Sequence, residues 1–402
     1  MHPLIYDWNL IDQPAGAAPR RVMLDDETLR DGLQSPSVRT PSLDQKVHIL
    51  HLMDSLGIDT ADIGLPGAGP HVVRDVEHLA REIISSKLKI RANCASRTML
   101  ADITPIIDIA QRTGLDIECC TFVGSSPIRQ YTEDWTLDRL QRLTEEAVST
   151  AVRAGLACMF VTEDTTRANP DSLRALYATA IRAGAKRVCV ADTVGHATPA
   201  GARAVVRFVQ TIVDECGGGV GIDWHGHRDR DLAIENSLAA MDAGATRLHG
   251  AGIGIGERVG NTPLDVLLVN LVLMGHREAD LTRLTDYCET IAEACGVPIP
   301  PNYPIVGRDA YRTATGVHAA AVIKAFKKND PTLADAVYSA VPATMVGREQ
   351  TIEVGPLSGK SNVIYWLERR GIEATDERVD RIFSRAKAAS GVLTEDEIKA
   401  LV

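Results

Sequence analysis

Two histidines separated by one residue carry the clearest chemical information in the sequence. His225 and His227 end an apolar run that begins at Gly221. In a β-strand, residues i and i+2 point to the same side, so both imidazoles can face one cavity and bind one metal ion. The alternative interpretation is a pair of packed or exposed histidines, and the motif alone does not decide between the two.

A second polar group follows the first apolar run of the chain. Arg30 and Asp31 stand in the segment DDETLRDG, residues 25–32. An aspartate with two histidines makes a mixed oxygen and nitrogen site, which suits a divalent ion (Mg, Mn or Zn) that keeps open positions for substrate oxygens. Such an ion can chelate a 2-oxo acid and polarise its carbonyl, while Arg30 stabilises the developing alkoxide. The simpler alternative for Arg30 is a surface ion pair.

These residues lie in a regular alternation of apolar runs and helical stretches that spans residues 21–278. Eight strand–helix units in a row predict parallel strands covered by helices, and eight strands close a barrel. An open doubly wound sheet is disfavoured because no glycine-rich dinucleotide fingerprint follows the first strand. We therefore expect an α/β fold, a (β/α)8 TIM barrel. Its strands are predicted at 21–26, 60–66, 89–96, 115–124, 156–164, 186–195, 221–227 and 246–254.

Composition excludes several classes of function. The net charge of −10 and the absence of a Lys/Arg run argue against a nucleic-acid partner. No apolar stretch approaches the length of a membrane span, and the N-terminus does not have the pattern of a secretory signal. The eight cysteines form no CxxC pair and mostly stand in apolar runs, so we expect reduced thiols in a cytoplasmic protein.

The alternation ends after residue 278, where helical patterns separated by loops rich in proline and glycine begin. We expect an N-terminal arm at residues 1–20, a catalytic barrel at 21–278 and a helical C-terminal subdomain at 279–402. Because the chain stops just after this helical tail, at Val402, we also expect no dedicated domain for feedback inhibition by leucine.

The combination of LRDG, HxH and GERxGN resembles the Claisen-condensing branch of the metal-dependent acyl-CoA lyase/synthase TIM barrels. That branch includes 2-isopropylmalate, homocitrate and citramalate synthases. The resemblance implies an acyltransferase of amino-acid biosynthesis that condenses acetyl-CoA with a 2-oxo acid and releases CoA. It also implies roles for single residues. The metal ligands would be Asp31, His225, His227 and Asn261; the oxo-acid contacts would be Arg30 and Thr193; and the acid after the fifth strand would be Glu163.

The C-terminal region extends the resemblance. His318, in the segment TGVH, and Tyr338, in the segment YSAVP, match residues that the family contributes to the active site of the partner subunit. The resemblance therefore implies a homodimer. In it, His318, supported by Glu163, deprotonates acetyl-CoA, and Tyr338 assists proton transfer. A histidine paired with a carboxylate is chemically suited to act as such a base.

The sequence departs from the family pattern at three positions: Arg228 replaces an asparagine, Leu33 replaces an acid, and Asp62 stands where a glutamate is usual. Asp62 remains a candidate substrate-binding residue. Leu33 is also typical of 3-hydroxy-3-methylglutaryl-CoA lyases, but those enzymes carry a catalytic cysteine after strand eight, and residues 250–261 contain none. A cleaving lyase is therefore the second interpretation, and a non-catalytic barrel subunit is the third.

The identity of the small-molecule oxo acid depends on Arg129. The segment SSPIRQY, residues 125–131, resembles the SPIH segment of isopropylmalate synthases, with Arg129 in place of the histidine. Some homocitrate synthases have an arginine here that binds the distal carboxylate of 2-oxoglutarate. A homocitrate-, citrate- or phosphonomethylmalate-type synthase is therefore the alternative to a 2-isopropylmalate synthase-like enzyme. A third possibility is that Arg129 pairs with a local acid, such as Glu133 or Asp134, or contacts CoA phosphate.

Overall fold

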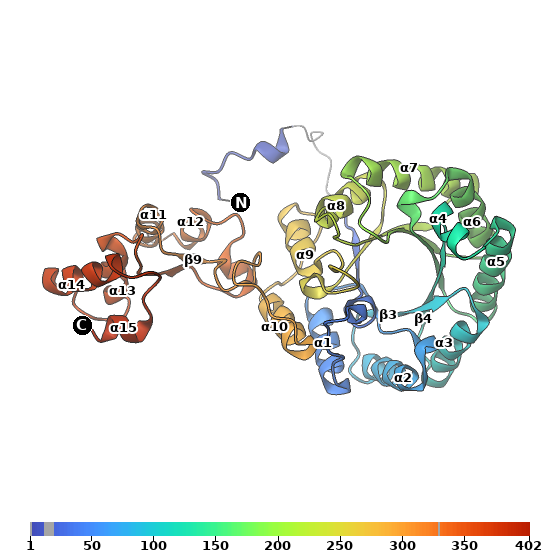
Figure 1. Ribbon diagram of the computed structural model, residues 1–402, viewed down its shortest axis with the longest axis horizontal. Coiled ribbons are helices and arrows are strands. Elements are labelled where there is room, and N and C mark those ends of the chain that lie inside the picture. The colour runs from blue at the N-terminus through green and yellow to red at the C-terminus, as the bar shows by residue number, and fades with distance from the viewer. Residues whose placement is uncertain (1, 12–19, 329) are drawn as a thin grey trace. The chain divides into compact units, whose positions relative to one another are not determined.

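The computed structural model describes residues 2–11, 20–328 and 330–402. The chain forms two compact units, which Figure 1 shows as ribbons. One unit comprises Pro19–Asp280 and Asp286–Pro298, and the other comprises Met1–Ala18, Leu281–Thr285 and Ile299–Val402. Residues 1 and 12–19 of the expected N-terminal arm lie outside the described residues.

The larger unit is a closed barrel of eight parallel strands in sequential order. It closes where β8 pairs with β1, with Met23 opposite Arg247 and Asp26 opposite Gly250. Each strand falls within or next to a predicted apolar run, so the predicted (β/α)8 barrel is confirmed. The strands are β1 (Met23–Asp26), β2 (Thr60–Asp62), β3 (Arg91–Arg97), β4 (Ile117–Gly124), β5 (Cys158–Glu163), β6 (Arg187–Asp192), β7 (Gly221–Gly226) and β8 (Arg247–Gly250).

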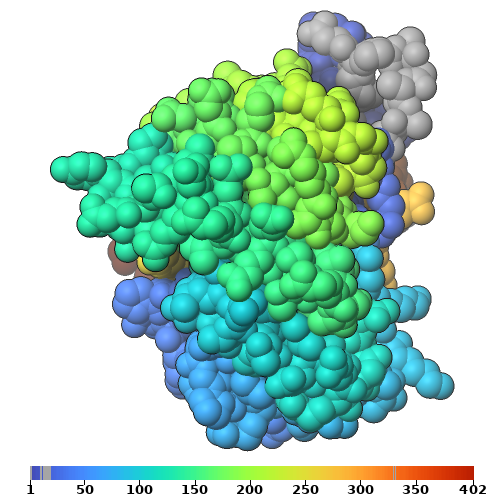
Figure 2. All heavy atoms as spheres, turned by 90° about the vertical axis from the view of Figure 1, so that its right-hand side faces the viewer, coloured from blue at the N-terminus to red at the C-terminus, as the bar shows by residue number. Residues whose placement is uncertain are grey.

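Helices surround the barrel, and Figure 2 views this outer layer from one side, with blue and cyan residues of α2 and α3 below yellow-green residues of α7. Their ends follow local rules. The side chains of Ser42, Thr136 and Thr198 accept a backbone N–H in the first turn of α1, α5 and α7, and Gly114 ends α3 in the left-handed conformation. The layer comprises α1 (Leu43–Ser55), α2 (Pro70–Ser85), α3 (Leu100–Thr113), α5 (Leu137–Arg153), α6 (Pro170–Arg182), α7 (Pro199–Glu215), α8 (Ala233–Ala243) and α9 (Leu264–Leu273).

Short elements follow the C-terminal ends of several strands, where they position polar residues. They are η2 (Asp31–Gln34) after β1, η3 (Pro66–Ala68) after β2, α4 (Pro127–Thr132) after β4, η4 (Thr165–Arg167) after β5 and η5 (Gly252–Gly254) after β8. The barrel unit also includes most of α10 (Leu284–Cys295), which the sequence analysis had placed with the C-terminal helices. The reason is packing: Tyr287 and Ile291 are buried, and both lie so close to Gly252 that a side chain there would clash with them.

The smaller unit is mainly helical. Two short parallel strands, β9 (Arg312–Thr313) and β10 (Thr351–Ile352), pair within it. One apolar cluster joins Val363, Leu367 and Ile382, and another joins Val322 and Ile352. No helix in the described part of the chain is long and apolar enough to span a membrane. The helices of this unit are η1 (Trp8–Leu10), α11 (Gly316–Phe326), α12 (Pro331–Ala336), η6 (Ala343–Val346), α13 (Lys360–Glu368), α14 (Asp376–Lys387) and α15 (Glu395–Lys399).

Candidate active site

Three side chains meet at the C-terminal end of the barrel, as their spacing in the sequence predicts. His225 and His227 come from the end of β7, and Asp31 begins η2 after β1. The two Nε2 atoms face each other at 3.2 Å. Asp31 Oδ2 lies 3.4 Å from Nε2 of His225 and 3.7 Å from Nε2 of His227. All three residues are buried, so three potential ligands converge on one point.

The donor set fits a divalent metal ion. Among the described residues, buried Asp31 Oδ1, His227 Nδ1 and Asn261 Oδ1 have no hydrogen-bond partner, and such atoms are costly to bury unless something binds them. Asn261 pairs with His227 in an isolated antiparallel bridge. Its amide nitrogen donates to the carbonyl of Ile255 at 3.1 Å, which leaves the amide oxygen as the free ligand atom. An aspartate, two imidazoles and an amide oxygen form a suitable mixed site.

The electrostatics keep His227 and Asp31 in the forms that bind a cation and place on His225 a proton that a cation can replace. Burial and the neighbouring His225 lower the pKa of His227 to about 4, so its imidazole is neutral at pH 7. Burial opposes charge on His225 as well, but Glu27 and Asp31 outweigh it and raise the pKa of His225 to about 9. Arg30 and His225 likewise outweigh burial at Asp31 and hold the pKa of this carboxyl well below its usual range. A cation would take the place of the His225 proton.

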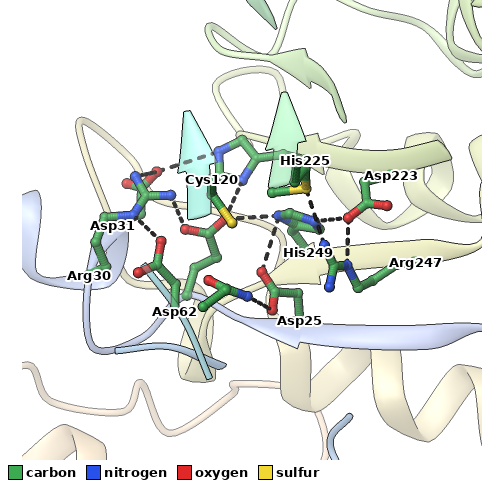
Figure 3. A network of polar contacts seen from close by, with 12 residues as sticks. Asp25, Arg30, Asp31, Asp62, Cys120, Asp223, His225, Arg247 and His249 are labelled. Atoms are coloured by element: carbon green, nitrogen blue, oxygen red, sulfur yellow. Dashed lines mark hydrogen bonds and ion pairs between the residues drawn. The ribbon is translucent and has the colours of Figure 1, made fainter. Parts of the chain in front are cut away.

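Arg30 is held beside the candidate metal ligands by three carboxylates. Its Nε donates to Asp62 Oδ2 at 2.9 Å and its Nη1 to Asp31 Oδ2 at 3.3 Å, and its Nη2 pairs with Glu27. Figure 3 shows Arg30, Asp31 and Asp62 grouped at one side of the polar network. The guanidinium is mostly buried, so its charge acts in a medium of low dielectric constant.

A pocket opens at this end of the barrel, and most of the residues predicted for the site line it. Asp62, Glu163 and Thr193 line it with Arg30 and the candidate metal ligands Asp31, His225 and His227. The Thr193 hydroxyl accepts the backbone N–H of Asp164 at 2.8 Å. Burial raises the pKa of Glu163, although Arg129 and Arg30 oppose the shift. One part of the wall is largely apolar and consists of Ala95, Cys120, Phe122, Met159, Val161, Cys189 and Ala191.

Arg129 is separate from the described residues that line this pocket. It lies in α4, where its guanidinium contacts Glu133 at 3.5 Å and Glu163 at 3.8 Å and stacks 5.7 Å from the centre of the Trp135 ring. Its side chain is 42% exposed. The local acid Glu133, which the sequence analysis left open as a partner, is therefore one of its contacts.

Glu27, His249 and Glu257 are among the pocket residues to which the sequence analysis gave no role. Glu27 and His249 are contiguous with the candidate metal ligands, since Glu27 Oε1 lies 3.2 Å from His225 Nδ1 and 2.8 Å from His249 Nδ1. Two-residue alternation relates Glu27 to Asp25 in β1 and His249 to Arg247 in β8. This alternation was the signal in the sequence that Glu27 and His249 could point into the barrel. Glu257 is the glutamate of the GERxGN motif at residues 256–261.

The smaller unit brings the two remaining predicted residues together. His318 lies in the first turn of α11, and Tyr338 follows α12. Their ring centres are 4.3 Å apart with a 30° tilt. Both side chains are exposed, so they form a small polar and aromatic surface within that unit.

Comparison with known proteins agrees with this geometry. A family model described as HMGL-like matches residues 21–291, which span the barrel strands and the candidate metal ligands. The chain belongs to the HMGL-like family. It is 33% identical to "Probable 2-isopropylmalate synthase" of Methanopyrus kandleri over 373 residues, covering 92% of this chain and 70% of that protein. It is also 33% identical to a homocitrate synthase of the same organism over 380 residues, covering 92% and 88%.

Among solved structures, the HMG-CoA lyase of Bacillus subtilis matches with a TM-score of 0.59 and 18% identity, covering 71% of this chain and 97% of that one. At this identity the likeness supports the barrel fold alone. The sequence relatives are synthases that extend past the barrel into the helical region. The family expected from the sequence is therefore confirmed.

Proposed function

We propose that this HMGL-like protein is an acyltransferase that condenses acetyl-CoA with a 2-oxo acid in a Claisen-type reaction. The observation that carries the proposal is the convergence of Asp31, His225 and His227 beside Arg30 in one pocket at the C-terminal end of the barrel, where TIM-barrel enzymes place their active sites. The synthase names of the relatives support this reaction class.

Asp31, His225, His227 and Asn261 would hold a divalent cation. When bound, this cation supplies Lewis acidity to the keto and carboxylate oxygens of the oxo acid. Arg30 directs its guanidinium toward the same place and stabilises the negative charge that develops on the keto oxygen. Asp62 fixes the guanidinium through the 2.9 Å hydrogen bond to its Nε, and Thr193 contributes a hydroxyl at the pocket wall.

The remaining step is removal of a proton from the methyl group of acetyl-CoA. We propose that His318 is the base, that Glu163 supports it, and that Tyr338 assists proton transfer. The methyl carbon then bonds to the keto carbon, and the keto oxygen takes up a proton to become a hydroxyl. Water cleaves the thioester and releases CoA, so the product is a 2-hydroxy-2-carboxymethyl acid. We further propose a homodimer in which each chain contributes His318 and Tyr338 to its partner.

The pocket wall favours an oxo acid with an apolar side chain. Cys120, Met159 and Cys189 form a buried apolar cluster with Val161 packed against it, and burying an anion against such a wall costs several kcal/mol if no cation meets it. Arg129, the candidate cation, already contacts Glu133 and Glu163. A 2-isopropylmalate synthase-like reaction is therefore our main proposal. A homocitrate-type reaction is the alternative, because Arg129 stands 3.8 Å from the pocket residue Glu163.

A panel of 2-oxo acids separates these substrates directly. The purified protein is incubated with acetyl-CoA, a divalent metal and each acid in turn, and the free thiol of CoA is measured. We expect the highest kcat/KM for a branched-chain acid such as 3-methyl-2-oxobutanoate and a low value for 2-oxoglutarate. Thiol release that no acid stimulates would contradict the condensation itself.

We further propose a cytoplasmic location. All eight cysteines have free thiols, which supports a reducing compartment.

A further inference from the structure

A chain of buried polar side chains runs from His225 toward the opposite end of the barrel. His225 Nδ1 lies 3.2 Å from Glu27 Oε1, and the same oxygen lies 2.8 Å from His249 Nδ1. On the far side of the ring, His249 Nε2 lies 2.9 Å from Asp223 Oδ2, which also accepts from Arg247 Nε at 2.5 Å. Figure 3 shows His225, His249, Asp223 and Arg247 in this sequence of contacts.

The chain occupies space that TIM barrels usually fill with branched aliphatic side chains. Glu27, Asp223, Arg247 and His249 are all buried. Taking such charges out of water is costly unless each has a partner, and here every link of the chain joins opposite charges. A purely structural core would be obtained more simply with apolar residues. The arrangement therefore indicates that these polar residues inside the barrel help to position the candidate active site at its C-terminal end.

The contacts determine which nitrogens carry protons. Both ring nitrogens of His249 face carboxylate oxygens, and carboxylates only accept hydrogen bonds, so both nitrogens donate and the ring is an imidazolium. His249 thus holds Glu27 in place through its positive charge and through the directed hydrogen bond from its Nδ1. Glu27 in turn accepts the Nδ1 proton of His225. Because this proton is held on Nδ1, the atom of His225 that a cation can take over is Nε2, which is directed toward Asp31 and His227.

We propose that Glu27 is a positioning residue for the metal ligand His225, and that His249, anchored by Asp223, holds Glu27 in its orientation. This inference rests on the proposed metal-dependent function. Carboxylates that accept the second N–H of a ligating histidine set its tautomer and ring orientation and raise its basicity. Arg30 contacts the other Glu27 oxygen, so the same carboxylate aligns a metal ligand and the guanidinium that faces the substrate.

The competing interpretation is a second cation site, because Glu27, His225 and His249 could themselves surround an ion. His249 would then need a lone pair on Nδ1, while its Nε2 remains bound to Asp223. The carboxylates on both sides of the ring favour the protonated form instead. The two interpretations differ in stoichiometry: the positioning role predicts one metal ion per chain, and the second site predicts two.

The test measures metal binding without substrate. Chelator-stripped full-length protein is titrated with Mn²⁺ by calorimetry, for the wild type, Glu27→Ala, Glu27→Gln and Asp26→Asn. Asp26 is the matched control, since it is the neighbouring buried carboxylate in β1 and contacts Thr28 and Tyr287. We expect one Mn²⁺ per chain, an affinity roughly 10–100-fold weaker in Glu27→Ala, a smaller loss in Glu27→Gln, which still accepts hydrogen bonds, and no loss in Asp26→Asn.

A second readout follows the His225 proton itself. In the Zn²⁺-loaded wild type, the Nδ1 proton should give a downfield, slowly exchanging NMR signal that persists in Asp26→Asn and disappears in Glu27→Ala. Adding His249→Gln to Glu27→Ala should weaken Mn²⁺ binding no further, because His249 acts through Glu27.

The outcomes separate the two proposals. Wild-type affinity in Glu27→Ala, an equal loss in Asp26→Asn, or two Mn²⁺ ions per chain would each overturn the positioning role and leave the proposed reaction intact. A wild type that binds no Mn²⁺ and no Zn²⁺ would instead overturn the metal site on which the proposed function depends, and this inference with it.

Discussion

At the scale of single residues, the candidate site is a set of side chains that need a cation to satisfy them. Two imidazole nitrogens face each other 3.2 Å apart, and Asp31 lies against both. Exhaustive chelation should therefore abolish condensation and lower the melting temperature, and adding back Mn²⁺ or Zn²⁺ should restore both, since a ligand bound only by the folded state stabilises it. Full activity in a sample shown to be metal-free would contradict the site.

Arg129 provides a second test at this scale. If the substrate side chain is apolar, Arg129→Met should leave kcat/KM for 3-methyl-2-oxobutanoate within about threefold of wild type, because the half-exposed guanidinium contacts Glu133 and Glu163 and no substrate group. An anionic substrate bound by Arg129 would instead lose roughly 2–4 kcal/mol of transition-state binding. Steady-state kinetics on both acids, with melting temperatures to exclude misfolding, decide between the two. A large loss confined to 2-oxoglutarate would favour the homocitrate-type reaction.

At the scale of elements, local pattern was sufficient to predict the barrel. Each strand is a short apolar run that ends in polar residues, and glycines such as Gly57 and Gly114 adopt the positive φ that stops a helix before the next strand. The HxH spacing also predicted the meeting of His225 and His227. These features depend on neighbours in the sequence, which is why a single sequence reveals them.

Contacts made only by barrel closure could not be predicted in this way. Glu27 directly follows β1 and His249 stands on β8, more than two hundred positions apart, and they meet because β8 pairs with β1. A glutamate and a histidine, judged by residue type alone, could equally well be exposed surface residues. The position of α10 was missed for the same reason. Its helical period was visible, but the pairing of Tyr287 with Asp26 depends on tertiary packing that no local pattern encodes.

This contact between β1 and α10 leads to a pH-dependent stability. Burial raises the pKa of Asp26 to about 7, against hydrogen bonds from Thr28 and Tyr287 that lower it. The folded state therefore holds a proton that the unfolded chain, with a carboxyl pKa near 3.8, gives up. Stability from this group is complete below about pH 4 and is lost as the pH rises toward 7, with a slope of at most about 1.4 kcal/mol per pH unit.

Asp26→Asn should remove this dependence, because the amide is neutral at every pH in the range. Urea unfolding at intervals from pH 5 to pH 8 measures it. We expect the difference in unfolding free energy between variant and wild type to shift in favour of the variant as the pH rises. Tyr287→Phe serves as the comparison, since it deletes the hydroxyl and keeps the carboxyl. A constant difference between Asp26→Asn and wild type across the range would refute the assignment.

At the scale of the whole molecule, the proposed chemistry is divided between two compact units. The barrel unit contains Asp31, His225 and Glu163, and the helical unit contains His318 and Tyr338, whose exposed rings lie 4.3 Å apart. The relatives named as synthases match both regions. A base supplied by one chain to the barrel of another would make the homodimer the functional form, since neither chain would hold a complete site.

Subunit mixing tests this arrangement quantitatively. His318→Ala and Glu163→Gln should each be nearly inactive alone. In a mixed dimer, the His318→Ala chain keeps an intact barrel and receives His318 from its Glu163→Gln partner, so one of the two sites is complete. Random exchange between equal amounts should therefore restore about one quarter of wild-type activity, as twofold symmetry requires.

Mixing Glu163→Gln with Asp31→Asn is the control, because both lesions lie in the barrel and every site then stays defective. Subunit exchange is verified with differently tagged chains. If exchange is complete and the first mixture stays inactive while the wild type is dimeric, each active site is built from a single chain.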